Sequence, residues 1–484
     1  MGSEGGLVRT LGLFTTITIV VGGVIGSGIF KKPGIMAAQV GSPEVLLLVW
    51  VLGGIITVFG AMSLAELSSM VPETGGQYVQ FDRIYGPFAG YLFGWSNFAV
   101  MITAGNAALA YVCAEALGRI VPLPDIGTSF EGFALRFPII GDVTPFKDSG
   151  IKLVALAIIT GLTVVNYLGV KLAGIVQIFA TIAKVFGMLL LVGVAIFTPG
   201  VGQAENFTND SATIHPAGLG MIVAIAAALQ GAFWAYDGWN KVTFIAGEVK
   251  NPQRAIPLGL VFGMLFVMAI YLSMTLAYIY VMPIDEMAGS RLVAADVADR
   301  CVPGGGKWIS VAIALSTFGA CNAGVLVGPR VFLAMARRNV FPHFLAAVNP
   351  RFHTPAAALL VQGVWTLFLL FTGTFDTLTD MLIFVSWIFY AASAYGVFVL
   401  RRREPDTPRP FRVPGYPVVP FVFVLAASGF LVMTLYNEYT NYQRAMAAGQ
   451  PAFLNCVFGT LLVLAGTPFY FYYRRKYRTT GITP

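Results

Sequence analysis

Two charged residues lie deep within long apolar stretches of this sequence. Lys184 lies in the run at 172–198, and Asp237 lies in the aromatic segment 233–239. A charged side chain at membrane depth is costly and commonly marks a substrate or ion pathway. A lysine ammonium can donate to backbone carbonyls, and a carboxylate can bind an ammonium. Both are therefore candidate site residues, against the alternatives of a lysine that reaches the membrane surface and an aspartate whose buried hydrogen bonds are satisfied.

A glycine-rich stretch provides a second candidate site. Residues 20–30 read Val-Val-Gly-Gly-Val-Ile-Gly-Ser-Gly-Ile-Phe, and each glycine weakens a helix by about 1 kcal/mol relative to alanine. Close helix packing explains Gly22 and Gly26, which have GxxxG spacing. It explains the step Gly26-Ser27-Gly28 less well, because consecutive residues point to different faces of a helix. We favour a broken helix here, whose second half would begin with free N–H groups that attract an anion.

The elements that must position these residues are membrane-spanning helices. Of the 484 residues, 57% are hydrophobic and 11% are charged, which is less than half the charged fraction of soluble domains. A short polar N-terminus without a cleavage site precedes the first apolar run, so no signal peptide is expected. Runs of roughly 20 apolar residues can cross a bilayer. Twelve are predicted, at roughly 14–30, 44–70, 87–118, 150–168, 172–198, 218–247, 257–281, 308–336, 355–373, 378–400, 418–436 and 452–473.

The basic residues orient these twelve spans. Nineteen Lys and Arg residues, including Lys241, fall on the side of both termini, and ten fall on the other side. Cytoplasmic loops carry an excess of Lys and Arg, so both termini are expected in the cytoplasm and the chain in the plasma (inner) membrane. Glu66 and Glu115 lie near span ends, where side chains that reach the interface are favoured.

Several other classes of function are disfavoured. The basic residues form no patch with stacking aromatics, which excludes nucleic-acid binding. The four cysteines and three histidines have no metal-ligand spacing, so no metal, cofactor or disulfide framework is expected. An intramembrane enzyme would need a nucleophile with a base, or paired carboxylates. A channel would need repeated polar residues along a pore, and neither pattern is present.

The two candidate sites occupy corresponding places in the chain. A carboxylate followed by glycine at Asp237-Gly238 also suggests an unwound turn. The first and sixth spans are the first members of two successive five-helix blocks, and two spans remain at the C-terminus. Matched interruptions in the two halves of a transporter point to its central binding site. Spacing alone supports this repeat, since the two halves share no evident sequence identity.

Segments throughout the chain resemble the L-amino-acid transporter family of the amino acid–polyamine–organocation superfamily. The matching segments are 26–30 (GSGIF), 65–67, 72–78, 86–87, 234–240, 248, 251–252, 256–257, 330, 337–338, 354–355 and 409–414. The resemblance implies an all-α polytopic membrane protein with twelve transmembrane helices and the leucine-transporter fold. In that fold, spans 1 and 6 are unwound within a 5+5 inverted repeat, and two extra helices follow. The expected divisions are a cytoplasmic N-terminus at 1–13, a first repeat at 14–198, a second, inverted repeat at 218–400, and a loop, two spans and a cytoplasmic C-terminus at 401–484.

The resemblance also implies a binding scheme for an amino acid carried by alternating access. The substrate carboxylate would meet N–H groups and the hydroxyl around Ser27 and Gly28. Its ammonium would meet backbone carbonyls of both broken spans, and Trp234 would form the external gate. The implied substrate-binding residues are Val24, Ile25, Gly26, Ser27, Gly28, Trp234, Ala235 and Asp237.

Lys184 matches a lysine that Na⁺-independent members of this family carry in the fifth span. Its ammonium would take the place of the cation that sodium-coupled relatives hold between the first and eighth spans. It would bond the carbonyls freed by the first break and repel Na⁺. We therefore expect Na⁺-independent exchange. A buried lysine can also exchange protons during a transport cycle, so a proton-coupled symporter of amino acids or polyamines is the alternative.

The expected substrates are small to medium neutral L-amino acids. The carboxylate of Asp237 would also admit basic ones, unless it pairs with the substrate ammonium or caps the broken helix. Animal members of the family join a heavy subunit through a cysteine in the loop after the third span. The loop at 119–149 has no cysteine, and Cys113 precedes it. The expected partners are therefore an L-amino acid and the lipid bilayer, without a disulfide-linked heavy subunit.

Overall fold

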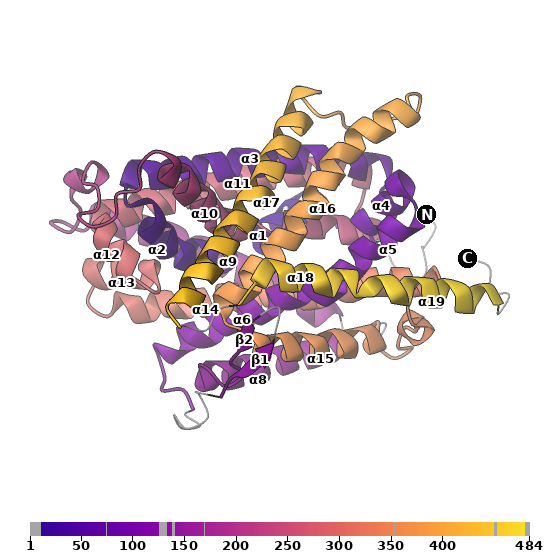
Figure 1. Cartoon of the computed structure of the whole chain (residues 1–484), viewed down its shortest axis with the longest axis horizontal. Helices are drawn as coiled ribbons and strands as arrows, with labels where there is room; N and C mark the ends of the chain where they lie inside the picture. Colours follow the sequence, from indigo (N-terminus) through magenta and orange to yellow (C-terminus); the bar gives the residue numbers. More distant parts are fainter. Residues whose placement is uncertain are drawn as a thin grey trace.

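The computed structural model describes residues 11–73, 75–124, 133–137, 141–168, 170–352, 354–449 and 453–479 (Figure 1). Within these ranges, ten helices are long and apolar enough to cross a membrane, and a bent pair of helices forms an eleventh span. The shorter apolar helix α15 (Ala356–Thr372) lies where the ninth span is predicted. The prediction of an all-α polytopic membrane protein is confirmed.

The first half of the chain forms five spans. Two of these helices begin with proline. Pro43 and Pro87 occupy the first turn of α3 and α5, where the missing backbone N–H has no helical partner to lose. The segments α5, η1 and α6 together make one continuous span, Pro87–Gly118. The elements are α1 (Leu13–Val24), α2 (Gly28–Val40), α3 (Pro43–Met70), α4 (Gln77–Tyr85), α5 (Pro87–Ser96), the π-helix η1 (Asn97–Met101), α6 (Ile102–Gly118), α8 (Ser149–Leu168) and α9 (Val170–Phe197).

The second half forms the remaining spans and two short helices between α11 and α14. Its elements are the 3₁₀ segment η2 (Ala204–Phe207), α10 (Leu219–Ala235), the 3₁₀ helix η3 (Trp239–Glu248), α11 (Pro252–Val281), α12 (Ile284–Gly289), α13 (Val293–Cys301), α14 (Gly305–Arg337), η4 (His343–Ala346), α15, α16 (Phe375–Arg403), α17 (Val418–Ala447), α18 (Asn455–Leu464) and α19 (Gly466–Thr479). The division into repeats at 14–198 and 218–400 stays a prediction.

The described residues include one small β-hairpin in the predicted loop at 119–149. Strand β1 (Leu135–Phe137) pairs antiparallel with β2 (Gly141–Val143), and Leu135 lies opposite Val143. These two strands were not predicted from the sequence. The hairpin lies between α6 and α8, outside the helices that form the candidate site.

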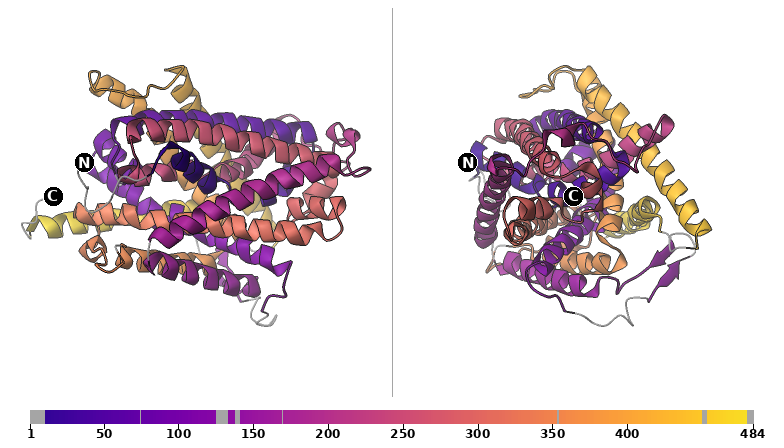
Figure 2. Two further views of the ribbon diagram at one scale, coloured as in Figure 1. Left: turned by 180° about the vertical axis from the view of Figure 1, so that it is seen from behind. Right: turned by 90° about the vertical axis from the view of Figure 1, so that its left-hand side faces the viewer.

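The helices pack as pairs that are distant in sequence. Helix α3 lies beside α11, and α6 lies beside α14 (Figure 2). Helices α12 and α13 lie at one end of the bundle, which we call the α12 end, and α4 lies at the opposite, α4 end (Figure 1). In the core, the rings of Trp50, Tyr236 and Tyr271 contact one another with centroids 5.2 to 5.8 Å apart. This aromatic cluster fixes α3, α10 and α11 around the centre of the molecule.

Candidate functional site

The first predicted break lies at residues 25–27. Helix α1 ends at Val24, α2 begins at Gly28, and the two helices are bent by 42°. The backbone of Ile25 is extended, with ψ 95°, and Ser27 precedes the first turn of α2. The first N–H groups of a helix have no preceding turn to bond. The broken first span is therefore confirmed, and α2 presents unpaired donors at its start.

The second predicted break lies at residues 236–238. Helix α10 ends at Ala235, a turn follows, and the chain continues as the 3₁₀ helix η3. Gly238 has φ +99°, a left-handed conformation that favours glycine because a Cβ is disfavoured there. The turn explains why Gly238 follows Asp237, and the unwound sixth span is confirmed.

The two breaks contact each other directly. A Cβ on Gly28 would lie 2.3 Å from Cα of Ala235, and one on Gly238 would lie 2.6 Å from the carbonyl oxygen of Gly23. The indole Nε1 of Trp234 donates to Oγ of Ser27 at 3.1 Å. Because the backbones leave no room for a Cβ at Gly28 or at Gly238, glycine is required at both positions. The sequence reveals the glycines, and the structure shows what each one approaches.

A small cavity of about 20 Å³ lies between the breaks. That volume holds about one water molecule, so the site is closed in this conformation. Predicted residues that line it are Val24, Gly26, Ser27, Gly28, Trp234 and Asp237, and the remaining wall is formed by Gly23, Met101, Gly105, Leu109, Lys241, Ala320 and Leu382. The other two predicted residues, Ile25 and Ala235, do not line the cavity, and their backbone carbonyls accept hydrogen bonds from Lys184 and Tyr271.

Lys184 lies against the first break. It is 1% exposed, and its ammonium donates to the carbonyl oxygens of Ile25 at 2.5 Å, Gly22 at 2.9 Å and Ser316 at 3.4 Å. An ammonium has three N–H donors and no acceptor, so these three carbonyls use its full capacity. The hydroxyl of Ser316 adds a bond to the carbonyl oxygen of Gly26 at 3.2 Å. Lys184 of α9 therefore stabilises the unwound segment by bonding its backbone carbonyls.

Tyr271 links the two breaks and was not predicted. Its hydroxyl lies 2.9 Å from the carbonyl oxygen of Ala235 and 3.3 Å from that of Val24. In the first turn of α2, the carbonyl oxygen of Ile29 accepts a hydrogen bond from the hydroxyl of Tyr278 at 3.3 Å. These tyrosines are seven residues apart in α11, a spacing that puts both on one helix face. Two polar hydroxyls on one face of an apolar span are a sequence signal that could have identified them.

Lys241 lies on the cavity wall close to Asp237. It was counted among the basic residues on the side of both termini, although it falls within the predicted sixth span at 218–247, and the structure places it on the cavity wall. The sixth span continues through η3 to Gly247, so a residue four positions after Asp237 is still at the depth of the cavity. On the opposite side, the hydroxyl of Tyr390 donates to Oδ1 of Asp237 at 2.7 Å.

Comparison with known proteins agrees with this geometry. Residues 11–461 match the model of the amino acid permease family. The chain belongs to this family. It is 30% identical to the serine/threonine exchanger SteT of Bacillus subtilis over 478 residues, which is 98% of each chain. It is also 30% identical to the b(0,+)-type amino acid transporter 1 of Mus musculus over 96% of this chain and 88% of the relative. The large neutral amino acids transporter small subunit 2 of Homo sapiens is 30% identical over 97% and 82%.

The permease is an amino acid transporter and not an enzyme, so its cavity must open and close. At the α12 end, Lys31 pairs with Glu115 of α6, and Lys32 pairs with Asp376 of α16 at 3.0 Å. Both ammonium groups lie over the ring of Phe375, at 4.6 and 4.8 Å from its centroid. Glu115 was expected to reach the interface, and in the structure its side chain is 15% exposed and pairs with Lys31.

Phe375 connects these ion pairs to the first break through Trp234. Its ring meets the indole of Trp234 edge-on, with centroids 5.7 Å apart. Trp234 is buried and in turn donates to Ser27. Ion pairs, an aromatic ring and the indole therefore lie in series above the cavity on its α12 side.

Toward the α4 end, a chain of hydrogen bonds closes the other side of the permease. The hydroxyl of Tyr390 also lies 3.3 Å from Oδ1 of Asn240. Nδ2 of Asn240 donates to Oε1 of Gln77 at 2.7 Å, and Nε2 of Gln77 donates to Oγ of Ser393 at 2.9 Å. All of these polar groups are buried. The chain joins Asp237 to α4 and α16.

A buried ion pair fastens the loop that follows α16. Glu66 is 1% exposed and accepts from Arg401 Nε at 2.9 Å and Arg401 Nη2 at 2.7 Å. The N–H of Val413 donates to the same carboxylate at 2.7 Å. Glu66 was expected to reach the interface, and this is wrong. A bidentate guanidinium and a backbone N–H satisfy its charge inside the protein.

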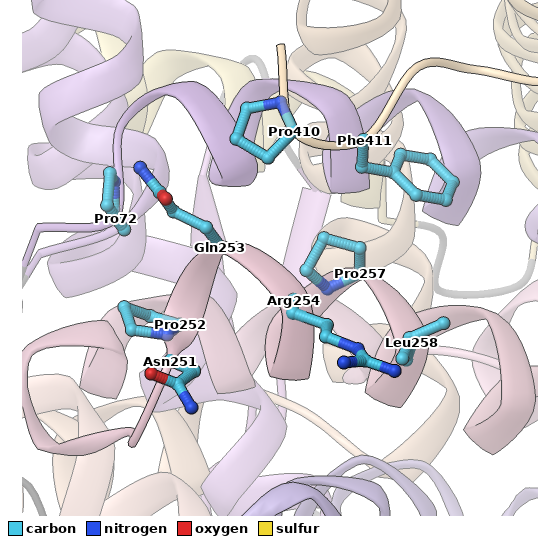
Figure 3. A pocket seen from close by; sticks show the side chains of 9 residues that line it. All are labelled: Pro72, Asn251, Pro252, Gln253, Arg254, Pro257, Leu258, Pro410 and Phe411. Carbon is cyan, nitrogen blue, oxygen red and sulfur yellow. The ribbon is translucent and has the colours of Figure 1, made fainter. Parts of the chain in front are cut away.

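A larger groove of about 920 Å³ lies where the start of α11 meets the loop before α17 (Figure 3). Four proline rings line it, at Pro72, Pro252, Pro257 and Pro410, together with Asn251, Gln253, Arg254, Leu258 and Phe411. Its one charged lining residue is Arg254. A zwitterionic amino acid needs a partner for each of its charges, so the smaller cavity between the breaks is the better candidate site.

Proposed function

We propose that this permease is a Na⁺-independent exchanger of small to medium neutral L-amino acids, working by alternating access. The observation that carries the proposal is the contact between two broken spans around Ser27, Gly28 and Asp237. Freed N–H groups at a helix start attract an anion, and freed carbonyls attract a cation. An α-amino acid carries both charges one carbon apart.

The binding scheme follows from these groups. The substrate carboxylate binds the hydroxyl of Ser27 and the N–H groups at the start of α2. Its ammonium binds carbonyls at the ends of α1 and α10. The walls contributed by Leu109, Ala320 and Leu382 are apolar and would receive a small side chain. Trp234 acts as the gate, since it lies between Ser27 and the ring of Phe375.

The contacts of Lys184 support independence from sodium. Its ammonium bonds the carbonyl oxygens of Gly22, Ile25 and Ser316, which join the first span to α14. Carbonyl oxygens are ligands that alkali cations use. A fixed positive charge there repels a second cation at a distance of a few Å. We infer that the lysine replaces a sodium ion.

The functions for which relatives are named further support exchange. SteT is a serine/threonine exchanger, and the human relative is named for large neutral amino acids. We propose a similar activity here, in the plasma (inner) membrane, with the α4 end and both termini in the cytoplasm. The repeats at 14–198 and 218–400 would move relative to each other. No cysteine in the loop at 119–149 is present to bind a heavy subunit, so the chain would work without one.

Proteoliposomes test this proposal directly. We expect labelled L-serine to enter vesicles preloaded with unlabelled L-serine, at equal rates in sodium and choline buffers and without a pH gradient. Uptake into empty vesicles that follows an imposed pH gradient would support the proton-coupled amino acid or polyamine symporter instead. Absence of uptake of serine, alanine, leucine and arginine under both conditions would overturn amino acid exchange itself.

A further inference from the structure

Two side chains of opposite charge share the cavity between the breaks. Asp237 lies in the turn after α10, and Lys241 lies one turn later on η3, and both line the cavity. Asp237 accepts a hydrogen bond from the hydroxyl of Tyr390 to its Oδ1. The two charges interact electrostatically. In a site that holds about one water molecule, each therefore lies close to a side chain of opposite charge.

A second ammonium, that of Lys184, lies against the first break and does not line the cavity. Lys184 and Lys241 are also within electrostatic range of each other. With one carboxylate and two ammonium groups, the site carries an excess of positive charge. A cationic side chain that enters must compete with Lys241 for Asp237 and approach two like charges. Proteins reject competing ligands through such repulsive elements, and in a water-poor site the repulsion is stronger than in water.

We propose that Lys241 is a specificity-determining residue that excludes amino acids with cationic side chains. This inference rests on the proposed function and concerns only which amino acids enter the site. Asp237 alone would favour an ammonium or guanidinium group on the substrate. The ammonium of Lys241 provides the positive charge that Asp237 would otherwise take from the substrate. The cavity therefore suits neutral side chains.

The experiment compares two ligands that differ in one group. L-2,4-Diaminobutyrate and L-homoserine have the same chain length, and one ends in an ammonium where the other ends in a hydroxyl. Each is used to compete with labelled L-serine in exchange by the full-length permease in liposomes. The measured quantity is the ratio of their inhibition constants, which changes in overall activity or folding do not move.

We expect wild type to prefer homoserine by about 10-fold or more, because of charge repulsion. Lys241→Gln should lower this ratio by about 10-fold, and Lys241→Arg, which keeps the charge, should leave it near the wild-type value. The double variant Lys241→Gln/Asp237→Asn should restore the preference for homoserine, since no carboxylate is then left for the cation. If Lys241→Gln does not transport, ligand-induced thermal stabilisation of the detergent-solubilised protein gives the same ratio.

Two results would overturn the inference. One is a ratio in Lys241→Gln within about twofold of wild type. The other is an equal change in Lys241→Arg, which would assign the effect to side-chain shape and not to charge. Failure of the proposed function is recognised separately, because wild type would then show no serine exchange before any variant is made.

Discussion

Lys184 donates a hydrogen bond of 2.5 Å to the carbonyl oxygen of Ile25, at the point where the first span loses its helical bonding. An unwound segment inside a membrane needs partners for its carbonyls, because the bilayer core offers no water. A side chain from α9, far along the chain, supplies them. Unwinding of the first span is therefore a property of the tertiary structure and not of its glycines alone.

Replacing Lys184 by Ala should leave the carbonyls of Gly22 and Ile25 without this donor. Each charge-assisted hydrogen bond contributes roughly 1.5–3 kcal/mol, so we expect a lower melting temperature and at least about a 10-fold loss of serine exchange. Lys307, which is exposed at the start of α14, provides the control Lys307→Ala. Thermal unfolding in detergent and exchange in liposomes check both. Sodium should stabilise Lys184→Ala more than wild type, and equal behaviour would contradict the cation-replacement argument.

Gly28→Ala should disrupt the crossing of the two breaks. The new Cβ would lie 2.3 Å from Cα of Ala235, so the backbone must move, at a cost of about 1–3 kcal/mol. Gly161→Ala in α8 is the matched control, because its Cβ would meet nothing within 4 Å and alanine favours helix. We expect exchange to be lost in the first variant and kept in the second. Normal serine exchange by Gly28→Ala would show that the contact is not required.

Removing the two ion pairs at the α12 end should expose the cavity. The double variant Glu115→Gln/Asp376→Asn breaks the ion pairs with Lys31 and Lys32. A shift of about 1.4 kcal/mol changes a conformational equilibrium about 10-fold. A cysteine introduced by Ala320→Cys on the cavity wall should then react about 10-fold faster with an impermeant thiol reagent. Arg300→Gln, which breaks an exposed pair with Glu286, should not change this rate, and an equal rate in both variants would contradict a closing role.

Acid should weaken one ion pair outside the spans. The hydrogen bond from Arg83 lowers the pKa of Glu404, a residue directly after α16. Because the pKa is lowered in the folded state, its contribution is present above the ordinary carboxyl range and is lost as pH falls through the lowered pKa. Glu404→Gln should therefore be less stable than wild type at pH 7, by at most about 1 kcal/mol for a partly exposed pair. Melting curves should converge as the buffer becomes more acid, and a gap that widens toward acid pH would contradict this assignment.

The sequence predicted the helix breaks because part of their cause is local. Four glycines in seven residues and the step Asp237-Gly238 weaken a helix wherever it packs. It also predicted that Lys184 would contact the first break, although that inference depended on resemblance to a known family. Of the twelve predicted spans, ten are long apolar helices in the described residues, the first is the bent pair of α1 and α2, and the ninth is the shorter helix α15.

Other parts of the site depend on partners that no local pattern reveals. Glu66 and Glu115 lie near span ends, and only the folded arrangement brings Arg401 and Lys31 to them. Lys241 was counted with the basic residues on the side of both termini, and only the structure, in which the 3₁₀ helix η3 follows Gly238, places it on the cavity wall. The bridging role of Tyr271 required the relative placement of three helices.

The ammonium that holds the first break is attached to the polypeptide and cannot dissociate into either compartment. In the proposed cycle, no inorganic ion moves down its gradient with the cargo. The energy for concentrating one amino acid must then come from the outward movement of another, so net flux would follow the ratio of amino acid pools across the membrane.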